Sequence, residues 1–203
     1  MAVQELFSCD IPAVCFESPY PQNPSIESKN FEASKRLTEY LIQNGHREIV
    51  FIAGKDVPIT RDRIAGYRAA LDENGIPFEE GRLLHAGYYS NDHGRNATQM
   101  LLNCGKSFTA VMYPDDFTAI AAYRDLAAAG LYVGKNISVT GFDGVSIGSM
   151  VSPRLTTIRQ DAACIGVRAA ELLIGLIDGS GIKEGMERLD FTLVPGESVY
   201  RLD

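Results

Sequence analysis

The strongest constraint on the fold is a repeating order: short, β-rich apolar runs alternate with longer amphipathic segments. The clearest run is EIVFIAG at 48–54, which is typical of a buried strand. Further strands are predicted at 11–16, 82–87, 109–113, 137–142 and 155–160, and two short ones near 187–194 and 197–201. Strands that alternate with helices in this way indicate an α/β fold with a Rossmann-type parallel sheet.

The segments between these strands have the spacing of amphipathic helices. In the first, over 28–44, Ala33, Leu37 and Leu41 recur on one face, and Gly45 follows as a left-handed stop. Four more helices are predicted at 60–74, from 90 or 91 to 104, at 115–129 and at 161–178. Glycine follows most of them directly, as expected at a helix C-terminus.

Charge and hydropathy exclude several classes of protein. The 203 residues carry 19 basic and 26 acidic side chains, a net charge of −7, with no basic cluster. Proteins that bind DNA directly usually present a basic face, so this chain by itself is not expected to bind nucleic acid. No apolar stretch reaches the length of a membrane span, and the N-terminus has no signal-peptide pattern. A cytoplasmic location and no membrane partner are therefore expected.

Metal and cofactor motifs are missing from the sequence. The cysteines, at 9, 15, 104 and 164, form no C-x-x-C pair, and reduced thiols are expected. The adjacent carboxylates Asp115 and Asp116 have no third and fourth ligand close in sequence. Neither a dinucleotide-binding G-x-G-x-x-G nor a phosphate-binding loop occurs. No metal and no cofactor are predicted.

Polar side chains follow the predicted strands where each strand ends. Ligands of open α/β sheets bind beyond the carboxyl ends of the strands, so these side chains are candidates for a common site. They are Glu17, the pair Tyr88 and Tyr89, Asp115, Asp143 and Gln160, joined by Arg63 in the first turn of the helix after EIVFIAG. Carboxylates, an amide, a guanidinium and an aromatic face suit a polyhydroxylated ligand. Structural roles remain open: Asp115 could cap a helix, and Asp143 could brace a turn.

GVSIG at 144–148 matches the G-x-S-x-G pattern of a hydrolase nucleophile elbow. That fold needs its histidine after the serine, whereas His46, His85 and His93 all precede Ser146. The segment after Ser146 also contains a proline within seven residues, which prevents the long elbow helix. Ser146 is therefore not expected to be a nucleophile, and no enzymatic activity is predicted.

Three segments in order carry a resemblance: GHREIVFIAG with RDRIAGYRAAL, AVMYPDDFTAIAAYRDLAAAGLYVGKNISVTGFDG, and SPRLTTIRQD. Together they resemble the effector-binding core of the LacI/GalR transcriptional regulators. The resemblance implies a periplasmic-binding-protein-like fold of two subdomains joined by three crossovers, with a small-molecule effector, expected to be a sugar, in the cleft between them. It also implies a homodimer that reaches DNA only through an N-terminal helix-turn-helix missing from this chain.

The same resemblance places the candidate residues at effector positions. Arg63 would clamp the effector, Tyr89 would stack on it, and Asp115, Asp143, Gln160 and Glu17 would line the cleft. Ala162 stands where the family often has an aromatic side chain, which would reshape one wall.

The expected organisation is a remnant of an N-terminal subdomain at 1–27, a complete C-terminal effector-binding subdomain at 28–156, and a crossover, helix and terminal strands at 157–203. Self-association is expected, because a partial subdomain leaves apolar surface exposed. Two other functions stay open at this point: a periplasmic-type solute receptor of the same fold, and an esterase that uses Ser146.

Overall fold

The computed structural model describes residues 11–17, 23–87, 91–180 and 185–202 and divides the chain into two compact units. Unit 1 combines Met1–Lys29 with Asp161–Phe191, and unit 2 combines Asn30–Gln160 with Thr192–Asp203. Each unit is therefore built from segments that are far apart in the sequence.

Unit 2 is organised around a four-stranded parallel sheet in the order β4-β3-β5-β6. Its strands are β3 (Ile49–Ala53), β4 (Leu83–His85), β5 (Ala110–Met112) and β6 (Ser138–Thr140). All five residues of β3 are buried, as expected for a central strand covered on both faces. The parallel α/β sheet predicted from the sequence is confirmed.

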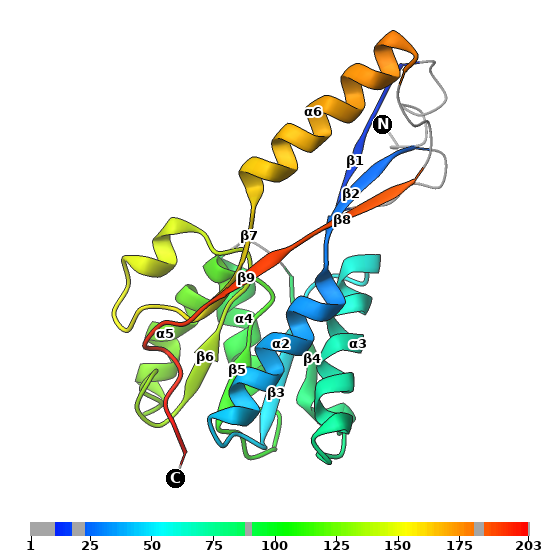
Figure 1. Ribbon diagram of the computed structural model, residues 1–203. Helices are drawn as coiled ribbons and strands as arrows, with labels where there is room; N and C mark the ends of the chain where they lie inside the picture. Colours follow the sequence, from blue (N-terminus) through cyan, green and yellow to red (C-terminus); the bar gives the residue numbers. More distant parts are fainter. Residues whose placement is uncertain (1–10, 18–22, 88–90, 181–184, 203) are drawn as a thin grey trace. The chain divides into compact units, whose positions relative to one another are not determined.

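Two pairs of helices flank this sheet (Figure 1). The helices α2 (Asn30–Gln43) and α3 (Pro58–Glu73) pack against each other, as do α4 (Asn91–Leu102) and α5 (Asp116–Ala128). Alternate strand residues pack with the second pair in one apolar core, which includes Val50, Ile52, Val111, Val139, Leu101, Ala122 and Leu126. The sheet is thus the middle of three layers. Because the helices cover its two faces, a binding site can form at the ends of its strands.

The end of the described chain closes unit 2. Strand β9 (Phe191–Val194) pairs with β7 (Thr157–Gln160) in a separate two-stranded sheet. Beyond it, the Ser198 hydroxyl donates to the Val139 carbonyl at 2.6 Å and accepts from the Thr156 amide at 2.8 Å. The Leu202 amide donates to the Asn44 carbonyl at 2.9 Å. The tail therefore ties β6, the segment before β7 and the end of α2 together.

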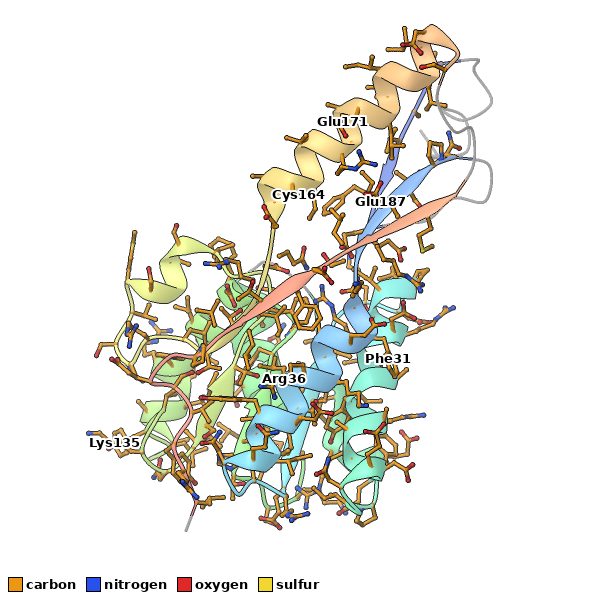
Figure 2. The ribbon with its side chains drawn as sticks, viewed as in Figure 1. Phe31, Arg36, Lys135, Cys164, Glu171 and Glu187 are labelled. Atoms are coloured by element: carbon orange, nitrogen blue, oxygen red, sulfur yellow. The ribbon has the colours of Figure 1, made fainter. Side chains whose placement is uncertain are left out.

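The described residues of unit 1 form a three-stranded parallel sheet in the order β1-β2-β8 and the helix α6 (Figure 1). Its elements are β1 (Cys15–Phe16), β2 (Ser25–Ser28), β8 (Met186–Leu189) and α6 (Ala162–Asp178). Arg168 on α6 donates two hydrogen bonds of 2.9 Å to the Glu187 carboxylate on β8 and also pairs with Glu171. Glu171 on α6 and Glu187 on β8 are labelled in Figure 2. The bidentate pair of Arg168 and Glu187 joins the helix to the sheet.

The structure differs from the predicted strands in four places. The strand expected at 11–16 is only two residues long, and no strand was expected at Ser25–Ser28, which pairs with both of its neighbours. The segment 197–201 is not a strand, because its polar groups bond to side chains and loops of unit 2. The region 187–194 holds parts of two strands, β8 and β9.

In the described part of the chain, no helix combines the length and the apolar character that a membrane crossing requires.

Candidate functional site

Arg63 is a buried guanidinium held in a fixed orientation, with its side chain only 5% exposed. Its Nε donates to Asn30 Oδ1 at 2.8 Å, and a terminal nitrogen donates to the Pro114 carbonyl at 3.0 Å. The guanidinium carbon lies 3.5 Å from the centre of the Phe142 ring, which is a cation–π contact. Since α3 begins at Pro58, Arg63 stands in the second turn of the helix rather than the first.

Asp143 follows β6 with a left-handed backbone (φ 99°), which is strained for a residue other than glycine. Its Oδ1 accepts a hydrogen bond from Gln160 Nε2 at 3.2 Å and lies 4.0 Å from a terminal nitrogen of Arg63. Strained backbones of this kind cost about 1–3 kcal/mol and concentrate at functional sites. The structure therefore brings three of the sequence-predicted residues, Arg63, Asp143 and Gln160, to one place in unit 2.

Asp115 lies at the same end of the sheet but has a structural task. It is fully buried as the N-cap of α5, where Oδ1 accepts from the Thr118 amide at 2.8 Å and Oδ2 from the Thr118 hydroxyl at 2.7 Å. Capping of this type stabilises a helix by about 1 kcal/mol. The capping role considered for Asp115 from the sequence is confirmed, and any contact with a ligand must coexist with it.

Asp116 is the acidic residue that sequence reasoning passed over. It is fully buried, its Oδ2 accepts from the Val145 amide at 2.7 Å, and its Oδ1 accepts from the Thr157 hydroxyl at 2.6 Å. Burial, with a smaller effect from the nearby Asp143 charge, raises the pKa of Asp116 to about 7. Gly141 is required here, because a side chain at 141 would collide with this carboxylate. Asp116 thus holds the loop that carries Asp143.

Two candidates remain, Glu17 and Tyr89. Glu17 belongs to unit 1, where it has a left-handed backbone (φ 49°) and its Oε1 accepts from the Ser28 amide at 2.7 Å. Tyr89, like the neighbouring Tyr88, lies outside the described residues. The roles of both in ligand binding stay predictions.

Two residues of the site were missed from the sequence: Asn30 and Phe142, which orient Arg63. Asn30 follows β2, the strand that was not predicted, so the strand-end rule was never applied to it. Phe142 was read only as the end of a strand.

Ser146 lies in the short 3-10 helix η2 (Ser146–Ser149), where its carbonyl accepts from the Ser149 hydroxyl at 2.7 Å. His46 is buried and bonded elsewhere: Nδ1 lies 2.9 Å from the Thr109 hydroxyl, and Nε2 lies 2.8 Å from the Ser138 hydroxyl. His46 therefore has a structural role and does not serve as a base for Ser146.

Residues 38–199 match the family model of the periplasmic binding protein-like domain. The chain belongs to the LacI/GalR family. This confirms the family resemblance that the three sequence segments carry, and it confirms the periplasmic-binding-protein-like fold.

Curated relatives in the LacI/GalR family are transcriptional regulators. The chain is 36% identical over 163 residues to the regulator GalR of Escherichia coli K12, which covers 80% of this chain and 47% of GalR. It is 30% identical over 178 residues to the repressor CytR of the same organism, covering 87% of this chain and 52% of CytR. The chain thus spans about half the length of these relatives.

Solved LacI-family structures have the same fold. A LacI-type regulator from Bacillus cereus subsp. cytotoxis superposes with a TM-score of 0.88 at 27% identity, covering 97% of this chain and 71% of that one. A complex of the regulator CelR with cellobiose superposes with a TM-score of 0.84 at 28% identity, covering 91% of this chain and 58% of that one.

Proposed function

We propose that this chain is the ligand-sensing part of a transcriptional regulator and that its ligand is a small polyhydroxylated molecule, a sugar in the first instance. Family membership supports the regulatory class. The carboxylate of Asp143, held in a strained backbone between Arg63 and Gln160, is the observation that carries the ligand-binding role.

The chemistry of this group suits hydroxyl groups. A carboxylate accepts hydrogen bonds from two vicinal hydroxyls, while a guanidinium and an amide donate to ring and hydroxyl oxygens. Arg63 is already oriented by Asn30 and Phe142, so little side-chain entropy is lost when a ligand binds. The cellobiose bound to the relative CelR fits this choice of ligand class. Glu17, Tyr89 and Asp115 are proposed as additional contacts.

A ligand can regulate the protein if it binds two of its conformations with different affinities. A ligand that binds one conformation of the protein more tightly shifts the population toward it. We propose that this shift changes DNA binding by a segment of the complete regulator outside this chain. The net charge of −7 fits this division of labour, since direct DNA binding needs a basic surface.

A homodimer is the proposed working form. Apolar side chains are exposed on two neighbouring elements of unit 2: Phe117 on α5 is 46% exposed, Ile147 on η2 is 37% exposed, and Met150 directly after η2 is 78% exposed. Exposed apolar groups of this size favour an interface with a second copy. Light scattering of a Met150→Glu variant tests this, with Met100→Glu on α4, which is 41% exposed, as the matched control. A dimer that persists unchanged in Met150→Glu contradicts this interface.

Thermal unfolding in the presence of a panel of monosaccharides, disaccharides (including cellobiose) and nucleosides tests the ligand class. A ligand that binds only the folded protein raises Tm, and the rise continues with the logarithm of ligand concentration above Kd. We expect a rise with at least one sugar, and we expect the Asp143→Asn variant to lose it. Absence of any shift across the panel would refute a sugar or nucleoside effector for this chain.

A further inference from the structure

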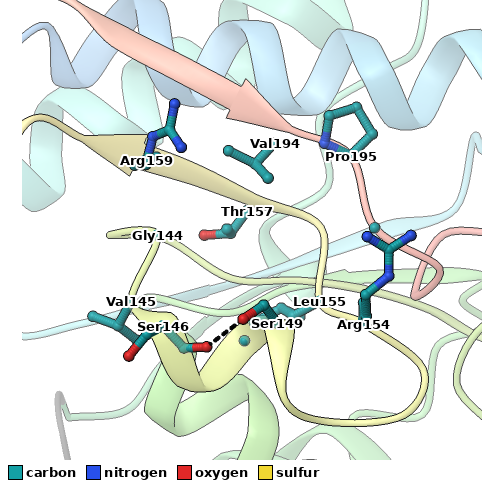
Figure 3. Close-up of a pocket in the computed structure, with 12 residues that line it drawn as sticks. Gly144, Val145, Ser146, Ser149, Arg154, Leu155, Thr157, Arg159, Val194 and Pro195 are labelled. Carbon is teal, nitrogen blue, oxygen red and sulfur yellow. Dashed lines mark hydrogen bonds between the residues drawn. The ribbon is translucent and has the colours of Figure 1, made fainter.

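A cavity of about 230 Å³ lies in unit 2 between the loop that follows β6 and the strands β7 and β9 (Figure 3). One wall is the segment around η2, with the hydroxyls of Ser146 and Ser149. The other walls come from β7, from Val194 at the end of β9, and from Pro195 directly after it. It is separate from the Arg63 group, which consists of Arg63, Asp143 and Gln160. None of these three residues lines the cavity.

The charge of this cavity is opposite to that of the chain. Two arginines, Arg154 and Arg159, line it, and none of its lining residues is acidic, in a protein of net charge −7. Figure 3 shows their guanidinium groups on either side of Val194 and Pro195. Arg154 pairs with Glu197 at 3.1 Å, whereas the guanidinium of Arg159 makes no hydrogen bond or ion pair with the described residues.

The walls are held in place by packing and hydrogen bonds. Gly144, with φ 71°, is so close to β7 that a Cβ there would lie 2.5 Å from Arg159 Cα, and one at Gly196 would collide with the Arg154 carbonyl. The next amide, that of Val145, is bonded to the buried Asp116 carboxylate. The cavity therefore exists before any ligand arrives, which reduces the cost of binding.

We propose that this cavity is a second ligand site, for a small anion that carries a phosphate or carboxylate group. The guanidinium of Arg159 supplies the charge and a planar pair of donors that matches either group. The hydroxyl of Ser146 supplies an additional donor at the opposite wall, whereas that of Ser149 already donates to the Ser146 carbonyl. A phosphate or carboxylate group is small beside a cavity of this volume, so the rest of a small metabolite has room as well.

The cavity is connected to the Arg63 group through adjacent backbone residues. Gly144 and Arg159 in the cavity wall are the sequence neighbours of Asp143 and Gln160, and Asp143 and Arg159 form a parallel β-bridge. An anion on Arg159 therefore acts on the loop that sets the position of the Asp143 carboxylate. The anion site itself does not depend on the identity of the effector.

Inorganic phosphate and malonate are the probes. Phosphate tests whether the site binds a phosphate group, and malonate tests whether it binds a carboxylate group. Tm is measured in each, against sodium chloride at equal ionic strength, for the parent chain and for Arg159→Gln. We expect phosphate or malonate to raise Tm above the chloride value, and titration calorimetry to show affinity for the better anion at least about tenfold weaker in Arg159→Gln.

Arg124→Gln is the matched control, since Arg124 is a 78% exposed arginine on α5 and its loss changes the net charge equally. It should retain the affinity of the parent chain. The proposal is overturned if neither anion raises Tm above chloride, or if Arg124→Gln and Arg159→Gln weaken binding to the same extent, because binding would then reflect overall charge alone.

Discussion

Gln160 donates a hydrogen bond from Nε2 to Asp143 Oδ1 at 3.2 Å, and its backbone amide donates to the Asp143 carbonyl at 3.3 Å. The end of β7 is thus tied twice to the strained residue after β6. β7 is the last element of unit 2 before the chain enters unit 1 at Asp161.

Replacement of Asp143 by asparagine should weaken sugar binding and leave the fold intact. Asparagine has the same shape and tolerates a left-handed backbone, but it lacks the charge and one acceptor. We expect the ligand Kd to rise at least about tenfold, as for loss of a charged hydrogen bond, in titration calorimetry. The control is Asp72→Asn at an exposed position of α3, which should bind like the parent. Equal affinities of all three proteins would remove Asp143 from the site.

Replacement of Arg63 by lysine should destabilise unit 2 by about 1–3 kcal/mol, because lysine cannot reach Asn30 and Pro114 together and leaves buried acceptors unpaired. The free energy of unfolding in urea measures this. Arg61→Lys, at a 65% exposed position of the same helix, should change it by less than about 0.5 kcal/mol. Similar small losses in both variants would mean that Arg63 is not held as described.

Two glycines inside helices should respond oppositely to alanine. At Gly66 a Cβ would collide with the Phe31 carbonyl and lie 2.9 Å from the Lys35 amide nitrogen, because α2 and α3 approach each other closely there. At Gly166 a Cβ meets nothing within 4 Å. Gly66→Ala should therefore destabilise the protein by about 1–3 kcal/mol, whereas Gly166→Ala should stabilise α6 by about 0.5–1 kcal/mol. Urea unfolding followed by circular dichroism tests both, and a gain from Gly66→Ala would contradict the close helix contact.

The buried Asp116 should make stability depend on pH. Its pKa is about 7 in the folded protein against an ordinary value of 3.8, so between these values the folded state holds a proton that the unfolded state releases. The free energy of unfolding from this group therefore falls as pH rises from about 4 to about 7, and levels off above. Asp116→Asn does not titrate at this position and should show a flatter profile.

His46 acts in the opposite direction, since burial lowers the pKa of its imidazole. The difference between the parent and Asp116→Asn cancels this effect and isolates the carboxyl. Unfolding free energies at pH 5, 6, 7 and 8 give that difference. Parallel profiles for the two proteins would show that Asp116 does not titrate in this range.

The local sequence pattern predicted most of the strands and helices of unit 2. It could do so because β3, β5 and β6 are apolar runs and because glycines end the helices. It failed where pairing between distant segments decides the structure. Ser25–Ser28 has a single apolar residue, yet all four residues are buried because β1 and β8 pair on both sides. The segment 197–201 has strand-like composition but bonds to His46 and Ser138 instead.

The residues of the candidate site divide in the same way, into those that the local sequence predicts and those whose role depends on contacts between distant segments. Arg63, Asp143 and Gln160 could be found because each has a defined place at a strand end or helix start. The role of Asp116 depends on burial and on its bond to the Val145 amide, 29 residues away, and neither is visible in the pair Asp115–Asp116.

The tail from Ser198 to Leu202 has a consequence for how the protein is made. A ribosome emits the chain from the N-terminus, so the strands β3 to β6 emerge long before the residues that close them. The hydroxyl that bridges Val139 and Thr156, and the carbonyl of Tyr200 beside the His46 ring, arrive only after α6 and β8 have been synthesised. The nascent sheet of unit 2 therefore lacks these closing contacts until residues 161–191 of the other unit have been translated.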